Sequence, residues 1–103
     1  MAVYVYQTFE LKQEKFKVGI ENLKKLKKYR NEQYNHTVDI LTPISGKDHT
    51  YALLTKFEGL AEMELQTKKM HEDEEYGKMI NEFFLEHIEQ GSIHTQLFRP
   101  MLD

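Results

Sequence analysis

The order of four strand-like and two helix-like segments is the feature that most constrains the fold of this chain. Apolar side chains recur at helical spacing over residues 13–30 and again over residues 60–91. Runs rich in β-branched and aromatic residues are typical of strands, and they cover residues 3–11, 36–42, 49–57 and 93–99. The order βαββαβ predicts an α+β, ferredoxin-like fold, in which two helices cover one face of a four-stranded antiparallel sheet.

Glycine and proline residues mark the expected boundaries of these segments. We expect the second helical segment to end at Gly91, because glycine readily adopts the left-handed conformation that closes a helix. Pro100 ends the last strand, and the run from Pro43 to Asp48 has the composition of a turn. With 103 residues and neither an internal repeat nor a linker-like segment, residues 1–103 are predicted to form a single domain.

Both faces of the predicted sheet are apolar, although its two helices cover only one. In the first strand Val3, Val5 and Phe9 point to one side, whereas Tyr4 and Tyr6 point to the other. The third and fourth strands alternate in the same way. Burial of one large apolar side chain is worth roughly 1.5–3 kcal/mol. We therefore predict a homodimer through the open sheet face; a monomer with an aromatic open face is the alternative.

Composition and charge exclude several classes of protein. The absence of cysteine excludes a disulfide scaffold, a zinc–cysteine site and a thiol nucleophile. No apolar run approaches the ~20 residues of a membrane span, so we expect no membrane partner and a cytoplasmic location. Residues 1–36 carry a charge of +4 and residues 58–103 carry −7. The net charge of −3 argues against nucleic acid as a partner. The basic cluster at residues 24–30 and the acidic cluster at residues 72–75 are both interpreted as solvated helix faces.

Short motifs along the whole chain resemble those of NIPSNAP-type domains in the dimeric α/β barrel superfamily. The run Tyr4-Val5-Tyr6-Gln7-Thr8-Phe9-Glu10-Leu11-Lys12 is similar to the first strand of that family. Similar elements are the strand-to-helix junction at residues 57–62, the helix start at 73–76 and the closing strand at 97–101. Three positions depart from the family pattern: Gln7 replaces an arginine, Gln13-Glu14 replaces Pro-Gly, and Tyr76 replaces a tryptophan.

The resemblance implies a pairing of two ferredoxin-like sheets into a dimeric α/β barrel, with a ligand pocket between each sheet and its helices. The superfamily includes cofactor-free monooxygenases, haem-degrading enzymes, lactone isomerases and stress-response proteins. We therefore expect a small apolar or aromatic ligand and no cofactor. For an enzyme, cofactor-free oxygenation or isomerisation is the implied reaction; the alternative is a non-enzymatic ligand-binding or stress-associated protein.

Four residues are candidates for the pocket. His87 lies on the apolar stripe of the second helical segment, where an imidazole could act as a general base. Its alternative role is to interact with the dipole at the helix end. Tyr6, Tyr51 and Tyr76 are candidate ligand-binding residues together with His87, because a phenol combines an apolar ring with an orienting hydroxyl. Core or interface packing would equally account for the three tyrosines.

Two other kinds of site are disfavoured by the sequence. The five histidines lack metal-ligand spacing, so no metal site is expected. RNA-recognition modules share the βαββαβ order, and Val3-Tyr4-Val5 is not unlike one of their motifs. However, His49-Thr50 stands where such a module carries a basic residue followed by glycine. An RNA-binding module is therefore the third alternative for the function, after an enzyme and a non-enzymatic ligand-binding protein.

Overall fold

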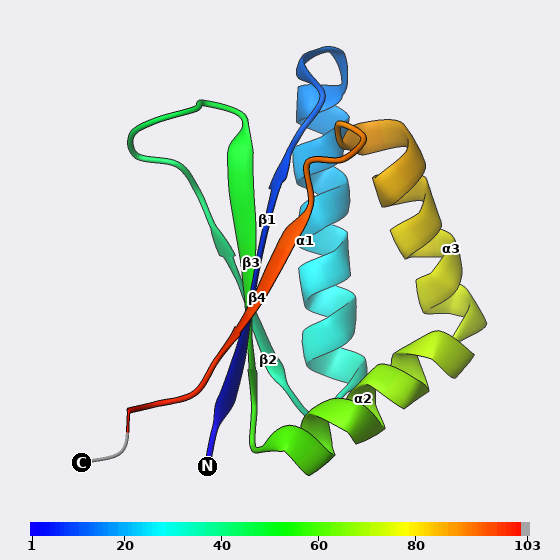
Figure 1. The fold of residues 1–103 in the computed structure, drawn as a ribbon. Coiled ribbons are helices and arrows are strands. Elements are labelled where there is room, and N and C mark those ends of the chain that lie inside the picture. Colours follow the sequence, from blue (N-terminus) through cyan, green and yellow to red (C-terminus); the bar gives the residue numbers. More distant parts are fainter. Residues whose placement is uncertain (102–103) are drawn as a thin grey trace.

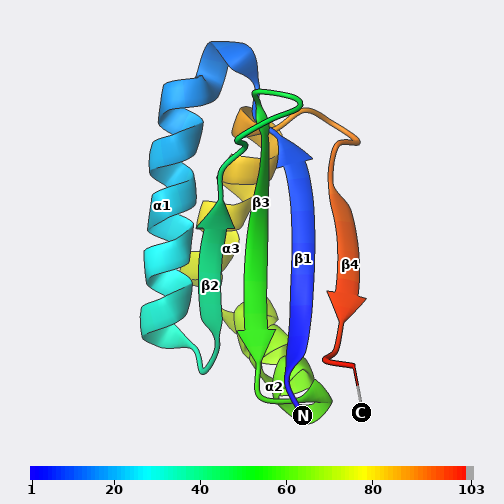
Figure 2. The ribbon, with the colours of Figure 1, turned by 90° about the vertical axis from the view of Figure 1, so that its left-hand side faces the viewer.

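The computed structural model describes residues 1–101 as one antiparallel sheet with all of its helices against a single face (Figure 1). The strands are β1 (Val3–Glu10), β2 (Thr37–Leu41), β3 (Thr50–Phe57) and β4 (His94–Phe98), in the spatial order β2-β3-β1-β4 (Figure 2). The helices are α1 (Phe16–Gln33), α2 (Leu60–Glu72) and α3 (Glu74–Glu82), with a 3-10 turn η1 (Gln13–Lys15) and a π-helical turn η2 (Phe83–His87). The predicted ferredoxin-like fold is confirmed.

Strand pairing fixes which side chains face the helices. Tyr6 of β1 lies opposite Leu54 of β3 and Gln96 of β4, so these three residues share a face. That face carries no helix, whereas Val5 and Phe9 point toward the helices. The predicted separation of the strand residues into two sets is therefore correct, with the tyrosines of β1 on the bare face.

The core lies between α1 and the centre of the sheet. Leu23 and Leu26 project from α1 and are each 1% exposed, because helical spacing places them on the same stripe. They pack with Phe9, Val38 and Leu53 of the sheet. Every helix in the described part of the chain is too short or too polar to span a bilayer.

The second helical segment forms two helices, not the one counted in the predicted βαββαβ order, and the second of them begins at the helix start that the resemblance places at residues 73–76. Asp73 adopts an extended conformation between α2 and α3, and its side-chain Oδ1 accepts a hydrogen bond from the backbone N–H of Tyr76 at 3.1 Å. This is the capping geometry of a new helix N-terminus. The break turns the chain, so that α2 and α3 form an arch over the sheet (Figure 1).

The expected helix end at Gly91 is wrong, because strand pairing ends the helix earlier. Ile88 is extended and forms a bridge with Leu11, just beyond β1. The N–H of Lys12 donates to the carbonyl of His87, and the N–H of Glu89 donates to that of Glu10, each at 2.9 Å. Gly91 does adopt a positive φ of 79°, but it does so in the turn that leads into β4.

Truncation of Leu23 tests the placement of the core. Because Leu23 is enclosed by the sheet, Leu23→Ala should lower the free energy of unfolding by about 2–5 kcal/mol, as measured by urea denaturation. Val18 lies on the same helix and is 51% exposed, so Val18→Ala should change it by less than about 0.5 kcal/mol. Equal losses in the two variants would contradict the described face of α1.

Candidate functional site

A cavity of about 570 Å³ lies between the helix-facing side of the sheet and the arch of α2 and α3. Its apolar wall includes Val5, Leu53, Phe57, Ile93 and Leu97 from the sheet and Leu26, Met63, Met70, Ile80, Phe83 and Phe84 from the helices. Ile93 and Leu97 are 37% and 51% exposed. The cavity is therefore partly open along the β4 edge of the sheet.

The joint of the arch is fastened to the end of α1 through the Asp73 carboxylate. Asp73 Oδ2 accepts hydrogen bonds from the hydroxyls of Tyr29, at 2.7 Å, and of Tyr34. The ring of Tyr29 also stacks on that of Tyr76, with centroids 6.0 Å apart. The bond to Asp73 raises the pKa of Tyr29 to about 12, and the two hydroxyls lower the pKa of Asp73. Asp73 is therefore ionised at neutral pH and holds both tyrosines.

A buried arginine supplies the principal polar group of the cavity. Arg30 lies in the C-terminal part of α1, lines the cavity and is only 6% exposed. Its Nε–H donates to Nε2 of His36 at 3.2 Å, and its Nη2 donates to the hydroxyl of Thr55 at 3.4 Å. The phenol of Tyr76 interacts with the same guanidinium. The sheet and two helices therefore converge on Arg30.

His36 contacts Arg30 as a neutral acceptor. Burial, and secondarily the nearby charge of Arg30, lower the pKa of His36 to about 4. Because Nε2 accepts the hydrogen bond from Arg30, the proton of the neutral ring is on Nδ1, which has no hydrogen-bond partner among the described residues. The pair therefore holds one positive charge, on the guanidinium.

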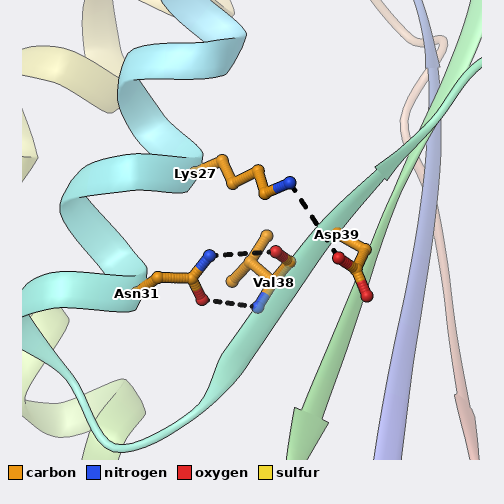
Figure 3. A network of polar contacts seen from close by, with 4 residues as sticks. All are labelled: Lys27, Asn31, Val38 and Asp39. Atoms are coloured by element: carbon orange, nitrogen blue, oxygen red, sulfur yellow. Dashed lines mark hydrogen bonds and ion pairs between the residues drawn. The ribbon is translucent and has the colours of Figure 1, made fainter.

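The end of α1 is also attached to the edge strand β2 (Figure 3). The side chain of Asn31 donates to the carbonyl of Val38 at 3.0 Å and accepts from its N–H at 2.7 Å. Lys27 reaches toward Asp39, with Nζ and Oδ1 3.9 Å apart at the surface. These contacts fix the backbone on both sides of Arg30 and so hold its guanidinium against the sheet.

The four residues predicted for the pocket do not converge on this cavity. Tyr76 lines it. Tyr51 is buried in the core, with its ring centroid 5.9 Å from that of Phe16. Tyr6 is on the bare face and, together with Tyr51, lines a smaller hollow of about 350 Å³ beside the β2–β3 loop. A ligand confined to the larger cavity would therefore contact only Tyr76 of the three tyrosines.

His87 faces α1 rather than the cavity. Its ring is 3% exposed, and Nδ1 lies 3.2 Å from the side-chain nitrogen of Asn22. A Cβ atom built at Gly19 would be 3.6 Å from the Cβ of His87, which shows how closely the two segments pack. A catalytic or ligand-binding role for His87 stays a prediction, as it does for the three tyrosines.

Arg30 and Gln7 both line the cavity, and each belongs to a pattern described in the sequence. Arg30 belongs to the basic cluster at residues 24–30, whose composition predicts a solvated helix face, yet it is four residues after Leu26 on the apolar stripe of α1. That spacing is the signal that could have identified it. Gln7, which replaces the arginine of the family pattern, lines the cavity and donates to Thr95 at 3.2 Å. The cationic group of this cavity thus comes from α1 and not from β1.

No metal centre is evident in the part of the chain that the structure describes. Within residues 1–101, no three His, Asp or Glu side chains come together in a geometry that could hold a metal ion. The polar side chains that line the cavity are Gln7, Lys27, Arg30, Thr55, Thr67, His71, Tyr76 and Asn81.

The buried neutral His36 predicts a specific pH dependence of stability. Its pKa is about 4 in the folded chain and 6.5 in the unfolded chain, so the unfolded state binds more protons between these values. The free energy of unfolding should therefore fall as the pH drops from about 6.5 to about 4, by up to about 3 kcal/mol for this group. The measurement is urea denaturation across that pH range.

His36→Gln is the matched variant, because its amide oxygen reaches about as far as Nε2 and can still accept from Arg30 but does not titrate. The free energy of unfolding of the variant should depend less on pH than that of the unmodified protein, by the contribution of one histidine. Identical slopes in the two proteins would contradict the assignment of His36 as a buried neutral acceptor.

Comparisons with known proteins place the fold. No protein-family model matches the sequence, and no curated protein matches it significantly. A NIPSNAP domain protein from Burkholderia xenovorans superposes with a TM-score of 0.79 at 13% identity, over 98% of this chain and 95% of that one. A NIPSNAP family protein from Agrobacterium tumefaciens gives 0.78 at 10% identity, over 98% and 94%.

An antibiotic biosynthesis monooxygenase of known structure has a TM-score of 0.74 at 12% identity, with 97% of this chain and 99% of that one covered. These identities are low, so the similarity concerns the fold. The resemblance noted in the sequence is confirmed at that level: the chain has the ferredoxin-like fold of NIPSNAP domain proteins and antibiotic biosynthesis monooxygenases.

Proposed function

We propose that this protein binds a small apolar or aromatic molecule in the cavity between the sheet and the α2–α3 arch. The cavity itself is the observation that carries the proposal. Its volume of about 570 Å³ falls within the roughly 300–1,000 Å³ of small-molecule sites. Its walls are mostly apolar, and three of its polar residues, Arg30, Thr55 and Tyr76, come together at one place. This combination is typical of sites that enclose an apolar ligand and orient it through one polar end.

For an enzymatic role, we propose cofactor-free oxygenation or isomerisation of the bound molecule. The similarity in fold to an antibiotic biosynthesis monooxygenase supports this reaction class. Binding without catalysis is the alternative, and the same cavity would serve it. Catalysis would require turnover of a bound compound, whereas a binding protein would release it unchanged.

Titration with the neutral fluorescent probe N-phenyl-1-naphthylamine tests the cavity. The probe should bind saturably, with enhanced fluorescence, because the walls exclude water from its rings. Thr67 lines the cavity from α2 and is itself exposed, so Thr67→Trp fills the site without disturbing the core. We expect this variant to weaken binding at least about tenfold, since an indole would occupy part of the ligand volume.

Leu65→Trp is the control, because Leu65 is on the same helix, 46% exposed, and not part of the cavity wall. Its affinity for the probe should equal that of the unmodified protein. The absence of saturable binding, or an equal loss in both variants, would refute the proposed site.

We also propose a homodimer through the bare sheet face. Figure 1 shows every helix on the other side of the sheet. Among the apolar residues of the bare face, Leu41 is 40% and Phe98 is 47% exposed, and the ring of Phe98 packs edge-on against Tyr6. The same face carries both Asp39 and Lys56, so a second copy can offer opposite charges across a two-fold axis. Sheet-to-sheet association would cover this apolar band.

Sedimentation of Phe98→Asp tests the homodimer. The unmodified protein should sediment at micromolar concentration as a particle of twice 12.3 kDa, and Phe98→Asp should be monomeric, because the interface would bury an unpaired carboxylate. Leu97→Asp makes the same change at the neighbouring position of β4, on the helix-facing side, and should leave the dimer intact. A monomeric unmodified protein would rule out the proposed homodimer.

A further inference from the structure

The cavity contains a buried cation that has no anionic partner in the described residues. The guanidinium of Arg30 donates to the uncharged side chains of His36 and Thr55, and the residue is only 6% exposed. The two ion pairs found within residues 1–101 lie elsewhere, at Lys27–Asp39 and Lys47–Glu10, on the surface. Buried charges in proteins are usually paired, because an isolated charge is costly to remove from water.

The cavity wall also lacks acidic residues. The sequence has 17 Asp and Glu residues, yet none is among the described residues that line the cavity. The basic side chains there are Lys27, Arg30 and His71, and only Arg30 is buried. The chain therefore does not itself provide a counter-ion inside this site, and an anionic ligand would.

We propose that Arg30 binds the carboxylate of the ligand, so that the cavity takes an apolar monocarboxylic acid. This inference rests on the proposed ligand-binding function. A guanidinium has five N–H donors; His36 and Thr55 take two of them, and a further one for Tyr76 still leaves two for a carboxylate. Two parallel N–H···O bonds are the preferred geometry of an arginine with a carboxylate.

The charge and shape of the site select this class of acid. One buried positive charge matches one carboxylate, whereas a phosphate monoester carries about −1.5 to −2 at neutral pH. The carboxylate would enter first, because Arg30 is at the buried end. The apolar body would then lie against Met63 and Phe84, toward the partly open β4 edge at Ile93 and Leu97.

Competition between two isosteric compounds tests the proposal. Displacement of N-phenyl-1-naphthylamine at pH 7.5 gives the affinities of naphthalene-2-carboxylate and of naphthalene-2-carboxamide, which differ mainly in charge. The unmodified protein should bind the carboxylate at least about tenfold more tightly than the amide. Arg30→Met should abolish this preference, and Lys28→Met, which removes a charge from an exposed position of the same helix outside the cavity wall, should retain it.

The outcomes separate this proposal from the proposed function. Equal affinities of the unmodified protein for the two compounds, displacement by neither compound, or a carboxylate preference that survives Arg30→Met, would overturn the role of Arg30 while the bound probe upholds the apolar site. Failure of the probe to bind would overturn both. The comparison in the unmodified protein requires no variant, so it decides the question even if Arg30→Met does not fold.

Discussion

The joint between α2 and α3 at Asp73 determines the space above the sheet. An unbroken helix over residues 60–82 would be about 34 Å long, more than the roughly 27 Å of β1, and would extend past the sheet. The extended Asp73 instead turns the chain into an arch. Because its carboxylate caps α3 and accepts from Tyr29 and Tyr34, one residue ends a helix, starts the next and fastens both to α1.

The arch leaves apolar surface that the chain does not fill. On the β2 side of the sheet, α1 packs directly on the strands and forms the core with Leu23 and Leu26. Beside this core, between the sheet and the α2–α3 arch, the 570 Å³ cavity remains. Arg30 lies where the two regions meet, held by His36 and Thr55. The packed core thus positions the charged group of the cavity, as the proposed ligand-binding function requires.

The sequence predicts the elements and the two faces of the sheet, because both follow from local periodicity. The alternation of Val5 with Tyr6 is visible in the strand itself. The helix end could not be predicted in this way, since Ile88 leaves the helix to pair with Leu11, a residue distant in sequence. The surroundings of His87 could not be predicted from the sequence either. The residue lies on the apolar stripe of its helical segment, but only the packed structure shows that it faces Asn22 of α1.

The burial of Arg30 could have been predicted from the sequence. Its type and its neighbours Lys27 and Lys28 indicate a solvated cluster, whereas its spacing from Leu26 indicates the core. The basic side chain predicts a solvated position and the helical spacing predicts a buried one; Arg30 is buried. The partners that make burial tolerable are His36, just before β2, and Thr55 of β3, and they are not recognisable as partners from the sequence.

The proposed function places an apolar ligand in the space under the arch and not on the bare sheet face. Methyl-labelled protein, titrated with N-phenyl-1-naphthylamine and followed by NMR, locates the ligand directly. The methyl groups of Met63, Leu53 and Ile80 line the cavity, and their signals should shift together in a saturable manner. Those of Leu41 and Leu54, on the bare face, should not move. Shifts confined to Leu41 and Leu54 would contradict the account.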